Sequence, residues 1–142
     1  MPFYGHSPRV RAVIHHDGRF LLAQHNNRRP ENMGKWGTPG GRVEHADPDL
    51  QEALRREIRE EFEIEVTVIG WVGTYEYKKR EHHVFLVHPH STQFVIDADE
   101  ILAYGWFTLA QVRQLAEEDR LHTGFELDAI ERSLALLARR QR

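Results

Sequence analysis

Three glutamates stand close together near the middle of the chain, at Glu57, Glu60 and Glu61. Their spacing of i, i+3 and i+4 places the three carboxylates on one face of a helix, within reach of each other. Like charges gathered in this way repel each other unless a cation lies among them. Mg²⁺ is the natural candidate, because it prefers hard carboxylate oxygens and commonly binds phosphate groups as well. The spacing therefore predicts a metal site that handles a phosphate-containing substrate.

A glycine pair lies upstream of these carboxylates, in the segment Pro39-Gly40-Gly41-Arg42-Val43-Glu44. Because glycine has no side chain, the backbone here can approach the carboxylate face closely. The alternative is an ordinary solvated helix face, braced by the neighbouring Arg55, Arg56 and Arg59. The glycine pair favours the metal site over this alternative.

Together these residues resemble the Nudix box. That motif runs Gly, five residues, Glu, seven residues, then Arg-Glu-U-x-Glu-Glu-x-Gly-U, where U is aliphatic. Gly41 matches the first position, residues 56–61 match the core, and Ile64 matches the closing aliphatic residue. The chain departs from the motif at Asp47, which replaces the first Glu, in a spacer from there to the core that is one residue longer, and at Glu63, which replaces the glycine. The extra residue falls in a loop, where it is easily absorbed, and every core carboxylate is present.

The resemblance implies an α/β fold, a Nudix-type α/β/α sandwich with a mixed sheet. It also implies an enzyme that uses Mg²⁺, or Mn²⁺, to hydrolyse a diphosphate linkage in a compound of a nucleoside diphosphate with another group. The metal ligands expected from the resemblance are Glu57, Glu60, Glu61 and the carbonyl of Gly40. Arg56 would orient a neighbouring glutamate. Glu44 is expected to brace the loop rather than to bind metal.

The general base in this family often comes from a later loop. Glu100 is the candidate here, in an acidic loop that also holds Asp97 and Asp99. A base must lie within hydrogen-bond reach of the attacking water, which a sequence does not reveal. An ordinary solvated acidic loop is the alternative.

Basic and aromatic residues outside the motif are candidates for substrate binding. Many relatives end the second strand with arginine, and His25 takes that place here. The candidates for binding phosphate are Arg9, Arg11, His25, Arg28 and Arg29, and the candidates for stacking on a base are Trp36, Tyr75 and Tyr77. For each aromatic residue the alternative is a place in the core or at its rim.

Three substrate or function classes are compatible with these residues. A nucleoside triphosphate, as in MutT-type enzymes, is expected first. A nucleotide sugar follows, because residues 20–30 and 36–43 also resemble GDP-mannose-type Nudix hydrolases; those enzymes typically lack part of the glutamate set, which this chain keeps. A non-catalytic Nudix-fold nucleotide sensor is the alternative from another class, although such modules tend to lose the glutamates.

The elements that must position these residues can be read from the pattern of the sequence. Strands are predicted at residues 10–15 and 20–24, joined by a tight turn, and a polar loop follows from residue 25 to 35. Asp49 is a plausible N-cap for a helix that ends near Phe62. Its apolar stripe, which lies largely apart from the carboxylates, consists of Leu50, Ala53, Leu54, Ile58 and Phe62.

The second half of the chain is predicted to add strands and two helices. A strand region at 64–77 is interrupted by Gly70 and Gly73, and residues 78–81 form the tip of a hairpin that continues into a strand at 83–87. Residues 93–96 are expected to form a short strand, and residues 103–107 another. One helix is capped by Thr108 and a final helix follows Thr123. This order predicts a mixed sheet covered on both faces.

Composition excludes several other classes of protein. The chain has 142 residues, a formal charge of −3 and no cysteine. We therefore expect a single domain over residues 1–142, no disulfide framework or cysteine nucleophile, and no nucleic-acid partner. No apolar run could span a membrane and no signal peptide is evident, so we expect a cytoplasmic protein with no membrane contact. A homodimer is an expectation by analogy with relatives only.

Overall fold

The computed structural model describes residues 7–27 and 29–141, which form six strands and three α-helices. The strands are β1 (Arg9–His16), β2 (Arg19–His25), β3 (Gly40–Arg42), β4 (Val66–Tyr77), β5 (Arg80–Pro89) and β6 (Ile101–Phe107). The helices are α1 (Leu50–Phe62), α2 (Leu109–Glu117) and α3 (Glu126–Arg140), and a short 3₁₀ helix, η1 (Pro30–Asn32), lies between β2 and β3. Among the described residues, no helix combines the length and the apolar character that crossing a bilayer requires.

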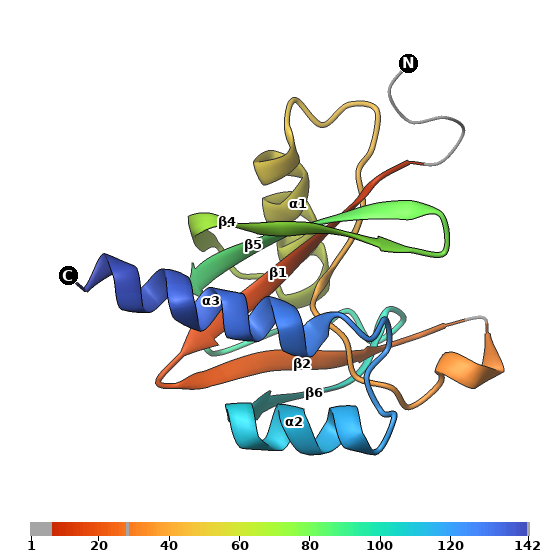
Figure 1. Cartoon of the computed structure of the whole chain (residues 1–142). Coiled ribbons are helices and arrows are strands. Elements are labelled where there is room, and N and C mark those ends of the chain that lie inside the picture. Colours follow the sequence, from red (N-terminus) through yellow and green to blue (C-terminus); the bar gives the residue numbers. More distant parts are fainter. Residues whose placement is uncertain (1–6, 28, 142) are drawn as a thin grey trace.

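The strands form one mixed sheet in the order β4-β5-β1-β2-β6, with β3 added alongside β1 (Figure 1). Strands β1 and β5 are parallel, whereas every other neighbouring pair is antiparallel. The prediction of a mixed sheet in an α/β fold is therefore confirmed.

Strand β1 changes its partner along its length, and this opens the sheet. It pairs with β2 only near their shared turn, at His15–Phe20 and His16–Arg19, while its first residues, 9–11, pair with β3. Between these regions the segment 37–39 crosses from β2 to β1, with Gly37 bonded to Ala23 and the Pro39 carbonyl accepting from the Ala12 amide at 2.8 Å. The glycine pair is thereby placed beside the start of β1, on the flank that β2 leaves unpaired.

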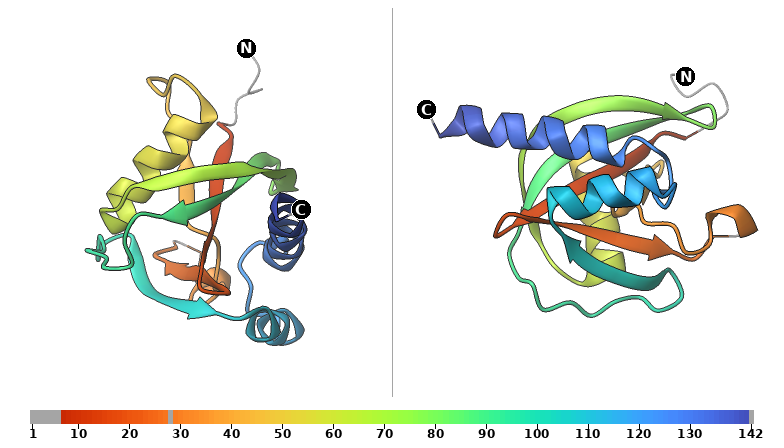
Figure 2. Two further views of the ribbon diagram at one scale, coloured as in Figure 1. Left: turned by 90° about the vertical axis from the view of Figure 1, so that its left-hand side faces the viewer. Right: turned by 60° about the horizontal axis from the view of Figure 1, so that its bottom comes forward.

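The helices cover both faces of the sheet, as the sandwich requires. Figure 2 shows α1 on one side of the strands and α2 with α3 on the other. Two apolar clusters correspond to these layers: one gathers Leu54, Ile58 and Phe62 of α1 against β1, and the other gathers the buried residues of α2 and α3. Because alternate residues of β1 point to opposite faces, Val10 belongs to the first cluster and Val13 to the second.

Helix α1 begins and ends at the residues that its sequence predicts. The Asp49 side chain caps it by accepting a hydrogen bond from the Glu52 amide at 2.8 Å. At the other end Glu63 has φ 53° and ψ 42°, the left-handed conformation that glycine adopts in the Nudix box. The glutamate therefore takes the backbone conformation of the glycine that it replaces.

The long β4–β5 hairpin also follows the sequence closely. Its register shifts between Val68 and Gly70 and again between Trp71 and Gly73, where the two glycines interrupt the pattern. At the tip, both Lys78 and Lys79 have positive φ, as the common two-residue hairpin turns require.

The prediction of a short strand at residues 93–96 is wrong. This segment has no regular structure, although its backbone is anchored to α1: the Val95 amide donates to the Phe62 carbonyl and the Asp97 amide to the Glu61 carbonyl. Phe94 and Ile96 pack against the first apolar cluster. Packing of alternate side chains thus produced the strand-like pattern without a neighbouring strand to pair with.

Candidate active site

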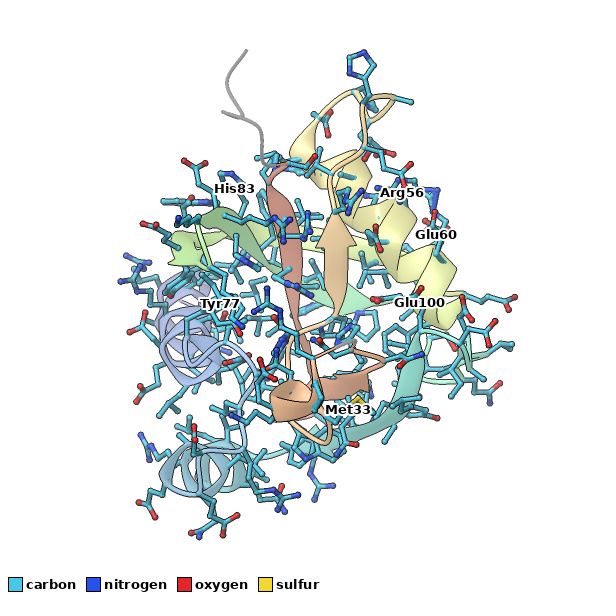
Figure 3. The ribbon with its side chains drawn as sticks, turned by 90° about the vertical axis from the view of Figure 1, so that its right-hand side faces the viewer. Met33, Arg56, Glu60, Tyr77, His83 and Glu100 are labelled. Atoms are coloured by element: carbon cyan, nitrogen blue, oxygen red, sulfur yellow. The ribbon has the colours of Figure 1, made fainter. Side chains whose placement is uncertain are left out.

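A cleft of about 630 Å³ lies beside the open edge of the sheet, between α1, the start of β1 and the loop before β6. It is lined by the glycine pair, by all three glutamates of α1 and by Arg9 and Arg11 of β1. Figure 3 shows Arg56 and Glu60 of α1 and Glu100 on one side of β1 and β3, with Tyr77 on the other side. The structure therefore brings most of the predicted site residues together.

Glu57 lies directly over the glycine pair. A Cβ atom at Gly41 would come within 2.5 Å of the Glu57 carboxylate, and one at Gly40, where φ is +145°, would lie 2.0 Å from the Val10 carbonyl oxygen. Only glycine fits at Gly40, and a side chain at Gly41 would require the Glu57 carboxylate to move. Burial, and then the charge of Glu61, raise the pKa of the Glu57 carboxyl to about 7.

Glu61 is the most deeply buried of the three glutamates, with its side chain 5% exposed. One carboxylate oxygen accepts a hydrogen bond from the Gly40 amide at 3.1 Å, and the other lies 3.1 Å from Nε2 of His25. This carboxylate therefore links the end of β2, the glycine pair and α1. His25 therefore lies at the site, as predicted, but its observed contact is with Glu61, whereas the predicted role was to bind phosphate.

Arg56 holds the loop between β3 and α1 against the helix. Its guanidinium donates two hydrogen bonds to Asp47, at 2.9 and 2.8 Å, and others to Glu57 and Glu60 at 3.2 and 3.1 Å. Asp47 also accepts from the Glu44 amide at 2.8 Å, and the bonds from Arg56 hold the pKa of its carboxyl below the usual range. Asp47, which takes the place of the first motif glutamate, is thus well placed to brace the loop.

The expectation that Glu44 is the brace needs correction. The Glu44 side chain is 58% exposed, and its carboxylate lies 3.5 Å from Arg56, farther than any of the bonds to Asp47. It lines the rim of the cleft. Asp47 therefore braces the loop, and Glu44 lies nearer to solvent.

The glutamates fit a divalent cation by their chemistry rather than by a preformed cage. Among residues 7–27 and 29–141, no three His, Asp or Glu side chains are close enough together to hold an ion as they stand. Their oxygens are hard donors, however, and two of the carboxylates are buried side by side, which a cation would stabilise. Glu60 is 55% exposed and bonded only to Arg56, so its side chain can rearrange at little cost. The donor set therefore suits a metal ion.

Two arginines of β1 face the carboxylates across the cleft. Arg11 donates to the Nδ1 atom of His82 at 3.3 Å and to the Thr38 carbonyl at 3.4 Å. Burial lowers its pKa, while the charge of Glu61 acts in the opposite direction. The cleft thus has an acidic wall on α1 and a basic wall on β1.

Two aromatic residues predicted to contact substrate lie elsewhere. The Trp36 ring packs edge-on against Phe107, with ring centroids 4.9 Å apart, and Tyr75 stacks on Phe125 at 4.7 Å while its hydroxyl donates to Asp128 at 2.7 Å. Neither lines the cleft, so the prediction that they stack on a base is not supported. Both belong to the second apolar cluster.

The remaining substrate-binding candidates lie in or beside the cleft. Arg9 and His25 line it directly, whereas Arg29 and Tyr77 line an adjoining cleft. Glu100, the predicted base, lines both clefts, and Asp97 lines the first. Arg28 falls outside the described residues.

Several lining residues did not emerge from the sequence. They are Asn27, Arg42, Arg80, His82 and His122. Arg42 follows the glycine pair directly and could have been found from strand alternation with Gly40. His122 comes from the turn between α2 and α3, and nothing in its local sequence marks it.

Comparison with known proteins agrees with this geometry. The family model described as "NUDIX domain" matches residues 5–125. The CTP pyrophosphohydrolase of Escherichia coli strain K12 is 39% identical over 82 residues; the aligned region covers 58% of this chain but only 57% of that protein. The chain thus matches little more than half the length of this curated relative.

Solved structures match over nearly the whole chain. The solution structure of the E. coli ORF135 protein has 29% sequence identity and a TM-score of 0.68, covering 94% of this chain and 92% of its own. A MutT protein from Methanosarcina mazei Go1 has 26% identity and a TM-score of 0.67, with 89% and 91% covered. The glycine pair beneath Glu57, the glutamates of α1 and the matched family model lead to one conclusion: the chain belongs to the NUDIX domain family.

Proposed function

We propose that this protein is a metal-dependent pyrophosphohydrolase that cleaves the diphosphate linkage of nucleoside diphosphate derivatives. The observation that carries the proposal is the pairing of opposite walls in one cleft. Glu57 and Glu61 lie buried over the glycine pair, and Arg9 and Arg11 line the same cleft. The acidic wall suits a cation and the basic wall suits the phosphates that the cation would bridge.

Nudix hydrolases generally use divalent metal ions. In this chain Glu57, Glu60, Glu61 and the carbonyl of Gly40 would hold the ion, with Mg²⁺ proposed first and Mn²⁺ as the alternative. When bound, such an ion neutralises charge that develops on phosphate oxygens and lowers the pKa of a bound water.

The chain's own residues would position these groups and the substrate. Arg56 fixes Glu57 and Glu60 relative to the loop, through hydrogen bonds of 3.2 and 3.1 Å. His25 and the Gly40 amide fix the Glu61 carboxylate from two directions. Arg9 and Arg11 would hold the phosphate chain in line with the carboxylates, which converts an encounter into an oriented attack.

Glu100 is proposed as the general base, with Asp97 as the alternative. Both carboxylates line the cleft beside the end of α1, where either could accept a proton from water. The backbone of Glu100 is fixed because its carbonyl accepts a hydrogen bond from the Asn26 amide at 2.8 Å. That bond ties the acidic loop to the end of β2, next to His25.

A nucleoside triphosphate is the proposed substrate. The full set of three glutamates supports attack at phosphorus, and the name of the E. coli relative, CTP pyrophosphohydrolase, makes CTP the first substrate to test. The nucleotide sugars and the sensor role become outcomes of the same experiment.

The test is product analysis with wild type, Glu61→Gln and the matched control Glu52→Gln. Glu52 lies on the same helix but is paired with Arg55 and Arg59, outside the cleft. Each protein is incubated with Mg²⁺ and a panel of canonical and oxidised nucleoside triphosphates, nucleotide sugars, ADP-ribose and dinucleoside polyphosphates. We expect Mg²⁺-dependent release of pyrophosphate from a triphosphate by wild type and by Glu52→Gln, and its loss in Glu61→Gln.

Other outcomes separate the alternatives. Cleavage of nucleotide sugars in preference to triphosphates would move the substrate to that class. Tight binding of one nucleotide without turnover of any compound would replace the enzyme with the sensor. Equal turnover in Glu61→Gln and wild type would contradict the metal-site assignment.

A further inference from the structure

A second cleft, of about 640 Å³, adjoins the first on the far side of β1. The two share Arg9, Arg11 and Arg42, so they form one continuous trough. The second cleft contains none of the three glutamates of α1. Its additional basic residues are Arg29, Lys78 and Arg80. This part of the trough is therefore predominantly basic, with Glu100 as its one lining carboxylate among the described residues.

The arginines of this cleft have no direct ion pair with a carboxylate of the protein. Among the described residues, no carboxylate lies within 4.0 Å of the guanidinium nitrogens of Arg9, Arg11, Arg42 or Arg80. Six of the ten other arginines that the structure describes do have such a partner, and Arg56 alone has four. These guanidinium groups are thus free of direct carboxylate contacts, although the charges of Glu57 and Glu61 counteract the lowering of the pKa of Arg9 and of Arg11 from a distance.

The strand register brings these charges directly together. Arg9 and Arg42 are Cα partners in the antiparallel pair of β1 with β3, and like charges directly opposite each other destabilise a sheet. On the other side of β1, Arg9 lies beside His82 of β5, and Arg80 is two residues away on the same face of that strand. The sheet therefore concentrates three guanidinium groups around one point.

Two observations indicate that this arrangement is costly in the free protein. Nε of Arg80 is buried and has no hydrogen-bond partner among the described residues, which is expensive for a charged group. Burial, followed by the charges of Arg80, Arg42 and Arg11, lowers the pKa of Arg9 to about 10. A bound polyanion would relieve the repulsion between these guanidinium groups.

The histidines of the same cleft are positioned as neutral rings and do not change the balance of charge there. His82 accepts a hydrogen bond from Arg11, and Nε2 of His122 lies 3.3 Å from the side-chain amide nitrogen of Asn27. Both rings are therefore positioned as neutral acceptors. Tyr77 packs edge-on against both rings. Neutral rings leave the arginines as the dominant charges toward a ligand.

We infer that this second cleft, which we call the arginine cleft, is a polyphosphate-binding site. Two phosphate groups of the substrate would lie at the carboxylates of α1, and any further phosphate group would bind in the arginine cleft. The consequence is a preference for substrates with three consecutive phosphates over nucleoside diphosphate sugars. The substrate preference rests on the proposed function, whereas binding of a polyphosphate anion to the arginine cleft does not.

The test separates binding from turnover. Isothermal titration calorimetry measures inorganic tripolyphosphate and pyrophosphate binding to the metal-free protein in EDTA. The variants are Arg42→Gln and Arg80→Gln, with Arg113→Gln as a control that removes one positive charge from α2, outside both clefts. We expect wild type and Arg113→Gln to bind tripolyphosphate about tenfold more tightly than pyrophosphate, equivalent to about 1.4 kcal/mol. Arg42→Gln and Arg80→Gln should lose this preference.

A second readout excludes a merely structural role for these arginines. Because each variant relieves repulsion in the free protein, we expect Arg42→Gln and Arg80→Gln to melt at or above the wild-type temperature. With CTP and Mg²⁺, KM should rise about tenfold in these variants while kcat changes little, as loss of ground-state binding requires. Lower melting temperatures together with unchanged tripolyphosphate binding would overturn the inference.

Failure of this inference and failure of the proposed function are distinguishable. Tripolyphosphate binding that depends on Arg42 and Arg80, without hydrolysis of any nucleotide, would support the arginine cleft and overturn the enzyme. Hydrolysis of CTP by a protein that binds tripolyphosphate no better than pyrophosphate would do the opposite. Equal affinities in Arg42→Gln and Arg113→Gln would show that only overall charge matters, which also overturns the inference.

Discussion

The Asp47 carboxylate accepts two hydrogen bonds from the Arg56 guanidinium, at 2.9 Å from Nε and 2.8 Å from Nη2. The aspartate side chain is only 8% exposed, and it also accepts a hydrogen bond from the Glu44 backbone amide. A two-point bond of this kind fixes orientation as well as distance. It ties the loop that follows the glycine pair to the helix that carries the three glutamates.

We therefore expect Asp47→Asn to destabilise the protein by about 2 kcal/mol, because an amide cannot replace a charge-assisted two-point bond. Glu44→Gln should change the free energy of unfolding by less than about 0.5 kcal/mol, since that side chain is largely exposed and its ion pair is longer. Urea denaturation of both variants measures the difference. A larger loss in Glu44→Gln than in Asp47→Asn would return the bracing role to the glutamate.

Removal of one glutamate charge should abolish turnover while the fold persists. In Glu61→Gln the side-chain carbonyl can still accept the Gly40 amide hydrogen bond, so the helix and the glycine pair stay linked. Without the negative charge we expect kcat to fall by about two orders of magnitude or more. The measurement is Mg²⁺-dependent diphosphate cleavage beside a thermal melt, with Glu52→Gln as the control. Loss of activity accompanied by loss of the folded state would leave the variant uninformative about metal binding, and Glu60→Gln, on the exposed face, then replaces it.

The general base can be assigned by comparing two carboxylates of one loop. Glu100→Gln should lower kcat by about 10²-fold, the lower end of a typical base contribution, with little change in KM. Asp97→Asn should leave kcat within a few-fold of wild type. Steady-state kinetics across pH 5 to 9 provides the check, because loss of a base also removes the acidic limb of the pH–rate profile. The reverse ranking of the two variants would make Asp97 the base.

Glu63 should gain stability when replaced by glycine. It adopts φ 53° at the C-terminus of α1, where a side chain is strained and glycine is not. We expect Glu63→Gly to stabilise the protein by about 1 kcal/mol, the usual cost of a left-handed non-glycine residue. Glu65→Gly is the matched control: Glu65 is not among the positive-φ residues of the described chain, so glycine there should destabilise. Thermal melts of the two variants in opposite directions are the expected result, and a lower melting temperature for Glu63→Gly would contradict it.

The two buried histidines should contribute a loss of stability as the pH is lowered from 7 toward 4, whereas Glu57, whose pKa burial raises to about 7, contributes in the opposite direction. Burial, and then the charge of Arg11, lower the pKa of His82 to about 3 and that of His122 to about 4. In the unfolded chain both rings protonate near pH 6.5, so between these values the unfolded state binds more protons and gains relative to the native state. Urea midpoints at pH 7, 6 and 5 measure the sum of these contributions, and the difference between wild type and a histidine variant isolates the histidine part.

His82→Asn should reduce this dependence, because asparagine can accept the Arg11 hydrogen bond without titrating. His16→Asn, at the exposed last residue of β1, serves as the control and should leave the slope unchanged. Identical slopes in wild type and His82→Asn would contradict the assignment of a neutral buried His82.

The helix and its carboxylates could be predicted from the sequence because they depend on local spacing. The cap at Asp49, the end at Phe62 and the common face of Glu57 and Glu61 are all set within one element. The register breaks at Gly70 and Gly73 were equally local. Such features need no knowledge of what packs against them.

The basic half of the site could not be predicted in the same way. Arg42, Arg80 and His122 come from three separate elements, and only the sheet order and the turn before α3 bring them to one trough. The prediction that Trp36 and Tyr75 stack on a base was not supported for a related reason. In the sequence, an aromatic residue near a motif looks the same whether it faces the cleft or the second apolar cluster.

The parallel pairing of β1 with β5 has a consequence for biosynthesis. Arg9 and His82 pair although roughly seventy residues separate them. The whole of α1 lies between them in the sequence, so it is synthesised before β5. While the chain emerges from the ribosome, the acidic helix is therefore complete long before β5 can close the basic wall. Non-local closure of this kind is slow compared with formation of a helix. We expect nascent chains to carry the carboxylates without the means to hold a nucleotide, so that activity arises in one late step rather than gradually with length.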